Sequence, residues 1–69
     1  MTMNVEEKFG KRVRALRMQR KWSQEELSFR CGVSKNYISD VERGTRNVSL
    51  KSIEKIANGL EVEIMELFY

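Results

Sequence analysis

Two short helices joined by a tight turn are predicted by residues 23–44, which read SQEELSFRCGVSKNYISDVERG. Ser23 opens the capping-box pattern Ser-x-x-Glu, in which the serine hydroxyl accepts a hydrogen bond from a first-turn amide and Glu26 reaches back to the serine. Gly32 is expected to end the first helix, because glycine adopts the left-handed conformation of a helix C-terminus without a steric penalty. This first helix is therefore short.

The second helix begins almost at once, because only one residue separates Gly32 from the next N-cap candidate, Ser34. Gly44 supplies another C-terminal glycine, so this helix is expected over about 35–43. A helix, a glycine turn and a second helix within about 20 residues make the helix-turn-helix arrangement, which lets the second helix protrude into the major groove of DNA. Helical hairpins without this role are also common, so the side chains must decide.

The rest of the chain is also expected to be helical, because proline is absent and no apolar–polar alternation is long enough for a strand. A first helix is predicted over about 4–20, with an apolar arc of about 80°: Val5, Phe9, Val13 and Leu16. A fourth helix is predicted from Ser49 to Gly59, with an apolar arc of about 120°: Leu50, Ile53, Ile56 and Ala57. One or two further helical turns are expected over about 62–68. The fold class is thus all-α, in one domain over 1–69.

Composition excludes several function classes. The chain has 69 residues, a single cysteine and no histidine, so an internal disulfide, the usual zinc sites and Cys/His catalysis are excluded. A phosphate-binding glycine loop and a nucleophile beside a base are also missing, so we expect no enzyme, cofactor, metal or small-molecule ligand. No apolar run is long enough to cross a bilayer, and the lone Cys31 fits a reduced compartment, so a cytoplasmic protein is expected.

The charge is unevenly distributed along the chain. Residues 1–22 carry seven Lys or Arg and two Glu, a net charge of +5, whereas the other 47 residues carry six basic and eight acidic side chains, a net charge of −2. A basic end on a mildly acidic body indicates a polyanionic partner. Solvated helix faces produce the same pattern, so charge alone leaves both interpretations open.

The side chains of the helix over about 35–43 favour a surface that reads DNA bases. Ile38 and Val41 define its buried side, and its outward and flanking positions carry polar residues: Lys35, Asn36, Tyr37, Ser39, Asp40 and Arg43. Lysine can donate to guanine O6 and N7, and asparagine can pair with adenine N6 and N7. Asp40 is the awkward member, because phosphates repel a carboxylate unless it accepts from cytosine or from a neighbouring arginine. Plain exposure to solvent explains these residues equally well.

Candidate phosphate contacts lie at the helix starts and in the loop after Gly44: Ser23, Gln24, Ser34, Arg46 and Asn47. First-turn amides and the helix dipole attract anions, and the Gln24 side chain can add a donor. The alternative is that the serines are simply caps and that the loop has ordinary polarity.

Glu42 lies only about 70° from the buried direction of its helix and therefore needs a partner. Arg17, at the edge of the apolar arc of the first helix, is the predicted partner.

Residues 16–62 resemble the phage-repressor and Cro-like (XRE) helix-turn-helix family. The motifs that carry the resemblance are SQEEL at 23–27, GVS at 32–34, YIS at 37–39 and ERG at 42–44. Short chains with the pattern YIS..ERG.RN.S look like the controller proteins of restriction-modification operons, which bind palindromic operators as homodimers and regulate their own gene and the endonuclease gene.

The resemblance implies a compact five-helix, lambda-repressor-like DNA-binding domain with the helix-turn-helix at about 23–43. It also implies the Arg17–Glu42 bridge and the DNA contacts named above. Controllers often have Arg-Thr where this chain has Lys35-Asn36, so the operator sequence cannot be borrowed. Ser28 and Cys31 replace the family's alanines, and both are small enough to keep the packing.

The C-terminal segment, about 61–69, is the candidate dimerisation surface. Its apolar residues spread more widely around the predicted helix than one small core requires: Ile64, Met65, Leu67, Phe68 and Tyr69. The alternative is that they complete the core of the monomer. Phe29 points away from Leu27 on its helix and is left as an exposed aromatic without an assigned role.

The leading hypothesis is a homodimeric, sequence-specific transcriptional regulator that binds a double-stranded operator and is controlled by its own concentration. RNA polymerase is a further candidate partner. The alternatives are a prophage-type repressor and an antitoxin-like protein-interaction module that uses Phe29 and the C-terminal segment.

Overall fold

A computed structural model describes residues 3–68 of the chain, as four α-helices followed by a short 3₁₀ helix. In chain order these are α1 (Val5–Gln19), α2 (Gln24–Cys31), α3 (Lys35–Arg43), α4 (Leu50–Leu60) and η1 (Ile64–Phe68). No strand occurs within this part of the chain. The all-helical prediction is confirmed, but the fifth α-helix is wrong, because the last element is a 3₁₀ helix of 5 residues.

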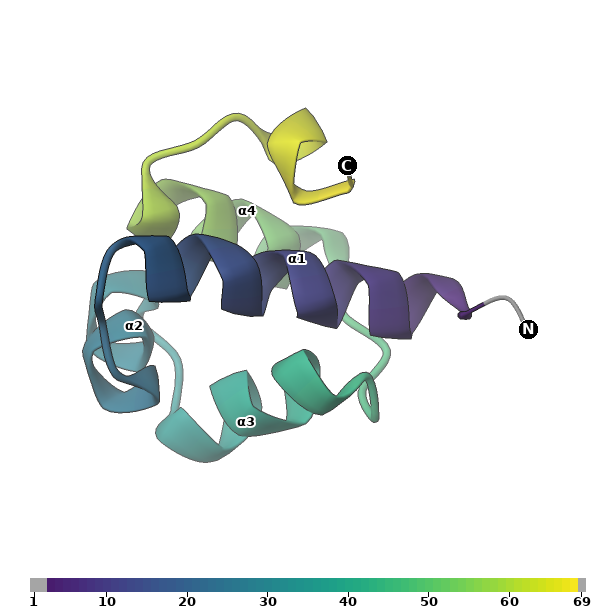
Figure 1. Cartoon of the computed structure of the whole chain (residues 1–69), viewed down its shortest axis with the longest axis horizontal. Coiled ribbons are helices and arrows are strands. Elements are labelled where there is room, and N and C mark those ends of the chain that lie inside the picture. Colours follow the sequence, from purple (N-terminus) through teal and green to yellow (C-terminus); the bar gives the residue numbers. More distant parts are fainter. Residues whose placement is uncertain (1–2, 69) are drawn as a thin grey trace.

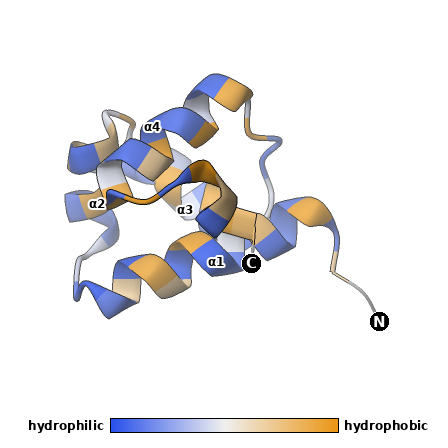
Figure 2. Ribbon diagram, turned by 90° about the horizontal axis from the view of Figure 1, so that it is seen from above, coloured by the Kyte–Doolittle hydropathy of each residue, from blue (hydrophilic) through white to orange (hydrophobic). Residues whose placement is uncertain are grey.

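α1 runs across the middle of the view in Figure 1 and packs against α3 and η1. In that view α3 lies on one side of α1, whereas α4 and η1 lie on the other, and α2 lies near the C-terminal end of α1. Figure 2 shows hydrophobic and hydrophilic stretches alternating along the helices, as expected where one side of a helix is buried. No helix within residues 3–68 is long and apolar enough to cross a membrane.

Serine side chains begin three of the helices, as the sequence predicts. The hydroxyls of Ser23, Ser34 and Ser49 accept hydrogen bonds from backbone amides three residues later, at 3.0, 3.0 and 3.1 Å. The second half of the capping box predicted at Ser23 is wrong. The Glu26 carboxylate binds Arg30 Nε at 2.8 Å one turn along α2, since an opposite charge attracts it more strongly than a neutral amide does.

The complete capping box lies instead at the start of α1. Asn4 Oδ1 accepts from the Glu7 amide at 2.8 Å, and Glu7 Oε1 accepts from the Asn4 amide at 3.1 Å. Asparagine caps a helix as well as serine does, so Asn4-x-x-Glu7 carried the same signal.

Gly32 and Gly44 end α2 and α3 in the left-handed conformation, with φ of 72° and 76°, as predicted. The predicted end of α4 at Gly59 is wrong, because α4 continues to Leu60 and Glu61 takes the left-handed cap at φ 59°. Gly59 instead lets two helices approach closely. A Cβ at this position would lie 2.4 Å from Cys31 Sγ on α2.

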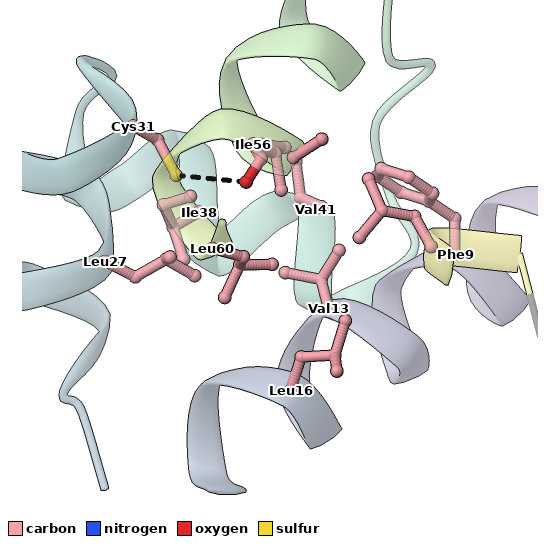
Figure 3. Packing of buried hydrophobic residues seen from close by; sticks show 11 residues of the cluster. Phe9, Val13, Leu16, Leu27, Cys31, Ile38, Val41, Ile56 and Leu60 are labelled. Atoms are coloured by element: carbon pink, nitrogen blue, oxygen red, sulfur yellow. Dashed lines mark hydrogen bonds between the residues drawn. The ribbon is translucent and has the colours of Figure 1, made fainter. Parts of the chain in front are cut away.

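The core gathers side chains from every helix, and Figure 3 shows how they meet. Its fully buried members come from all five elements: Val13, Leu27, Ile38, Val41, Ile56, Leu60 and Leu67. Two residues of the predicted apolar arcs are not part of it, because Val5 and Leu50 are 61% and 84% exposed. Both lie at the first residue of their helix, where the neighbouring elements no longer cover them.

Two arginines of the N-terminal basic segment form hydrogen bonds that hold other elements of the fold in place. Arg12 Nε donates to the Glu66 carbonyl at 2.7 Å and fastens η1 to α1. Arg20 donates to the Leu60 carbonyl at 2.8 Å, at the C-terminal end of α4. Two of the seven basic side chains of residues 1–22 therefore hold neighbouring elements in place, and both keep their positive charge.

Candidate nucleic-acid interface

The two buried residues of α3 hold it on the core and leave its opposite side in solvent. Ile38 and Val41 are 0% and 1% exposed. The other side of the helix presents the side chains that the sequence selected for reading bases: Lys35, Asn36 and Arg43 are exposed, and Tyr37, Ser39 and Asp40 are partly exposed. The structure thus places all six on or at the edge of one polar, solvent-facing surface, which we call the α3 ridge.

An ion pair between α1 and α3 fixes the position of this ridge. Arg17 Nε lies 2.7 Å from Glu42 Oε2, and Arg17 Nη2 donates to Glu42 Oε1 at 3.0 Å, which is the two-pronged geometry that arginine and carboxylate favour. The two side chains are only 13% and 4% exposed. Arg17 Nη1 also donates to the Trp22 carbonyl at 2.8 Å, so the guanidinium joins α1, the following loop and α3.

Gln24 completes this cluster. Its Nε2 donates to Glu42 Oε1 at 3.1 Å, which links the start of α2 to α3 across the helix-turn-helix. The sequence predicts a phosphate contact for the Gln24 side chain and gives no sign of this structural role. An amide nitrogen carries two protons, so one donor stays available beside the first turn of α2. Each buried side-chain nitrogen or oxygen within the described residues has a hydrogen-bond partner.

Asp40 forms ion pairs with two arginines at the C-terminal end of the α3 ridge. Its Oδ1 accepts from Arg43 Nη2, and its Oδ2 accepts from Arg46 Nη2 at 3.3 Å. The hydrogen bonds from Arg43 and then Arg46 lower the pKa of the Asp40 carboxyl below its ordinary value. The Asp40 carboxylate, which phosphates would repel, is therefore paired with neighbouring arginines, one of the two alternatives given for it above.

The loop after Gly44 folds back onto α3. The Thr45 amide and hydroxyl both donate to the Asp40 carbonyl, at 3.1 and 3.2 Å. The Arg46 guanidinium consequently lies 4.7 Å from the centre of the Tyr37 ring, a cation–π distance. Sequence reasoning missed the Tyr37–Arg46 contact, because a left-handed glycine separates the two residues and helical spacing cannot relate them.

The remaining candidate backbone contacts lie at the surface. Ser23 and Ser34 are exposed, and their hydroxyls cap α2 and α3. Asn47 is exposed in the loop beside Arg46.

A second, apolar surface lies on α4 and η1, and we call it the α4–η1 groove. It is lined by Leu50, Ile53, Ile64 and Phe68, with Lys51 and Glu54 at the same place. Ile64, Met65 and Phe68 are 48%, 64% and 51% exposed. Leu67 is different from the sequence expectation, because it is fully buried in the monomer core and offers no surface to a partner. Tyr69, also predicted at the dimer interface, lies outside the described residues.

Phe29 stands apart from both surfaces. It is 84% exposed on α2, so burial in the monomer does not explain it. Within residues 3–68 no group of three or more His, Cys, Asp or Glu could hold a metal ion.

This geometry is that of a helix-turn-helix protein, and comparison with known families agrees. Residues 13–67 match the Helix-turn-helix family model, and the chain belongs to this XRE-type family of DNA-binding transcriptional regulators. The resemblance inferred from the sequence motifs is confirmed.

Within the family, the chain is similar to restriction-modification controller proteins. It is 50% identical over 68 residues to the control protein C.BamHI of Bacillus amyloliquefaciens, an alignment that covers 97% of this chain and 84% of the relative. The crystal structure of the controller protein C.AhdI from Aeromonas hydrophila is 49% identical, with a TM-score of 0.89 over 91% of this chain and 96% of that one. The wild-type controller C.Esp1396I is 30% identical, with a TM-score of 0.86 over 97% and 90% of the two chains.

Proposed function

We propose that this chain is a sequence-specific transcriptional regulator that binds a palindromic DNA operator as a homodimer, as the controller protein of a restriction-modification operon. Its place of action is the cytoplasm, where such an operon lies. The observation that carries the proposal is the α3 ridge, which is anchored from beneath by Ile38 and Val41 and presents donors outward. Similarity to C.BamHI and C.AhdI supports the assignment to controllers.

The α3 ridge and the segments beside it have different tasks in this proposal. Lys35 and Asn36, in its first turn, read base edges in the major groove, with Tyr37 and Ser39 beside them. Arg46, Asn47 and the first turn of α2 contact phosphates and set the register of the protein on the duplex. The Arg17–Glu42–Gln24 cluster holds these parts in one relative orientation.

Dimerisation doubles the few base pairs that one module can contact. The α4–η1 groove is the surface that we assign to the second copy, because Leu50 and Phe68 leave it apolar and Lys51 beside Glu54 gives it both charge signs. A two-fold axis pairs a surface with itself, so a surface that carries both signs can match its own copy. Two half-sites should then lie about 34–36 Å apart on one face of the DNA.

Selection of binding sites from a randomised duplex library tests the proposal. The wild-type chain should enrich an inverted repeat, and Lys35→Ala or Asn36→Ala should relax the choice at particular positions by about 1–3 kcal/mol each. Lys55→Ala, a change on the exposed side of α4, is the matched control and should leave the selected site unchanged. A library without any enriched sequence after selection would refute sequence-specific binding.

Phe29 favours a second candidate function, a contact with a protein partner such as RNA polymerase. An aromatic side chain that is 84% exposed contributes nothing to the monomer core and is typical of protein interfaces. In this case Phe29→Ala should leave operator affinity unchanged and reduce transcription in a purified system. Equal transcription by both proteins at saturated operator would contradict the contact.

A prophage-type repressor would use the same geometry, and the neighbouring genes separate the two assignments. A methyltransferase and an endonuclease gene beside this one would support the controller. Phage structural genes would support the repressor.

A further inference from the structure

The α3 ridge carries its own counter-anion. Asp40 is the acidic residue on the exposed side of α3, and both of its carboxylate oxygens are occupied by arginines, Oδ1 by Arg43 and Oδ2 by Arg46. The arginine side chains are 63% and 48% exposed, so they are otherwise open to an incoming phosphate. Without DNA, two cations of the proposed interface are thus already paired within the protein.

The arrangement is built by the backbone as well as by charge. Gly44 turns the chain in the left-handed conformation at φ 76°, and Thr45 donates twice to the Asp40 carbonyl. This brings Arg46 back toward α3, where Tyr37 supports its guanidinium from one side. Arg46 therefore has two partners on α3, and its side chain is held over the ridge.

Exposed ion pairs are weak enough to exchange. Pairs of this kind contribute little to stability, because water screens them and because two long side chains must be ordered. A phosphate can displace Asp40, but only by losing the internal pair and by bringing its own charge near the Asp40 carboxylate. On DNA of any sequence, this competition reduces the binding free energy gained from each arginine–phosphate contact.

The balance is different on the operator. There Arg43 and Arg46 gain from being held in defined positions, because a side chain that is already ordered loses less conformational entropy on binding. Asp40 then both competes with the DNA and orients the arginines, and the two effects partly cancel. On random DNA, Asp40 still competes with the phosphates, but the ordered positions of Arg43 and Arg46 give less benefit than on the operator.

We propose that Asp40 determines selectivity, because its single negative charge pairs with Arg43 and Arg46 and so weakens the binding of random DNA relative to the operator. This inference rests on the proposed function as a sequence-specific regulator. Asp40 acts here through the two arginines and is a positioning residue. It differs in this respect from Lys35 and Asn36, which are proposed to touch bases directly.

The test compares Asp40→Asn with Glu63→Gln. Each change removes one negative charge. Glu63 is an exposed residue of the segment between α4 and η1, and it is not among the residues that line the α4–η1 groove. Figure 1 shows this segment on the side of α1 away from α3. Binding is measured by fluorescence anisotropy between 50 and 300 mM salt. The probes are the duplex enriched by selection and a scrambled duplex of the same composition.

Asp40→Asn should tighten binding to the scrambled duplex and should steepen its log–log salt dependence by about 1–2, since each added phosphate contact contributes a slope of about 0.9. That slope corresponds to about eightfold per contact between 1 M and 0.1 M salt. Affinity for the enriched duplex should rise less, so the ratio of the two affinities falls several-fold. Asp40→Glu keeps the charge and should keep most of the wild-type ratio, whereas Glu63→Gln should leave the ratio and both slopes unchanged.

Two results would overturn the inference. One is an Asp40→Asn protein that behaves like Glu63→Gln, and the other is a change of both duplex affinities by the same factor, which would make Asp40 a plain electrostatic penalty. Failure of the proposed function gives a different result, namely a wild-type protein that does not distinguish the enriched duplex from the scrambled one.

Discussion

Removal of the Glu42 carboxylate should strongly lower the free energy of unfolding. Glu42→Ala leaves the Arg17 guanidinium, which is 13% exposed, with the Trp22 carbonyl but without its counter-charge. Breaking a buried ion pair from one side costs about 3–5 kcal/mol, because the remaining charge is desolvated and unpaired. A chain of 69 residues has a free energy of unfolding of only about 3–10 kcal/mol, so most of its stability is at risk.

The exposed pair on α2 provides the control. Glu26 binds Arg30 at 2.8 Å, but the two side chains are 43% and 40% exposed, so Glu26→Ala should cost only about 0–1 kcal/mol. Thermal unfolding followed by circular dichroism measures both variants. At about 4–8 °C per kcal/mol, a loss of about 3 kcal/mol lowers the Tm of Glu42→Ala by about 12–24 °C.

A double variant separates the lost pair from the stranded charge. Arg17→Met combined with Glu42→Met removes both charges and keeps most of the buried volume, so much of the stability should return. Equal and small losses for Glu42→Ala and Glu26→Ala would refute the reasoning. The same holds for a double variant that is less stable than Glu42→Ala.

Three further predictions concern the core, the dimer and the thiol. Gly59→Ala should destabilise the protein by about 1–3 kcal/mol in urea unfolding, because its Cβ would lie 2.4 Å from Cys31 Sγ; an unchanged midpoint would contradict the close approach of α2 and α4. Ile64→Asp and Phe68→Asp should give monomers in sedimentation experiments and should bind the operator weakly, whereas Val5→Asp, also at an exposed apolar residue, should do neither. Dimers that persist in both variants would exclude the α4–η1 groove as the dimer interface. Burial raises the pKa of the Cys31 thiol from 9.0 to about 11, so the unfolded chain loses its thiol proton first and stability should fall between about pH 9 and 11, by up to about 1.4 kcal/mol per pH unit. Cys31→Ala should lack this part of the pH dependence, and identical profiles for the two proteins would contradict the assignment.

The helices were predictable from sequence because their signals are local. Serine caps, left-handed glycines and apolar spacing act within one or two turns, and Ser34, Gly44, Ile38 and Val41 fix α3 almost completely. The Arg17–Glu42 pair was also within reach, because an acid close to the buried side of a helix requires a cation from a facing helix.

The wrong predictions of burial have a different physical origin, because they depend on where the neighbouring elements begin and end. Leu50 satisfies the apolar arc of α4 but lies beyond the elements that could cover it, whereas Leu67 is covered because η1 packs on α1. The terminal segment is a 3₁₀ helix, so side-chain directions based on 100° per residue do not apply to it.

Contacts across the turns were also not predictable from the sequence. The sequence predicts a DNA contact for Gln24, but its amide nitrogen donates to Glu42, and the Tyr37–Arg46 contact depends on the path of the loop after Gly44. No spacing rule within one helix relates such residues, because their proximity follows from how the helices are joined.

Dimethyl sulfate probing of the bound operator tests the central claim most directly, because this reagent methylates guanine N7 in the major groove and adenine N3 in the minor groove. We predict protection of guanine N7 in two half-sites centred about one helical turn apart, with loss of part of that protection in Lys35→Ala. Protection confined to adenine N3, or guanine N7 positions that react as in free DNA, would contradict the insertion of α3 into the major groove.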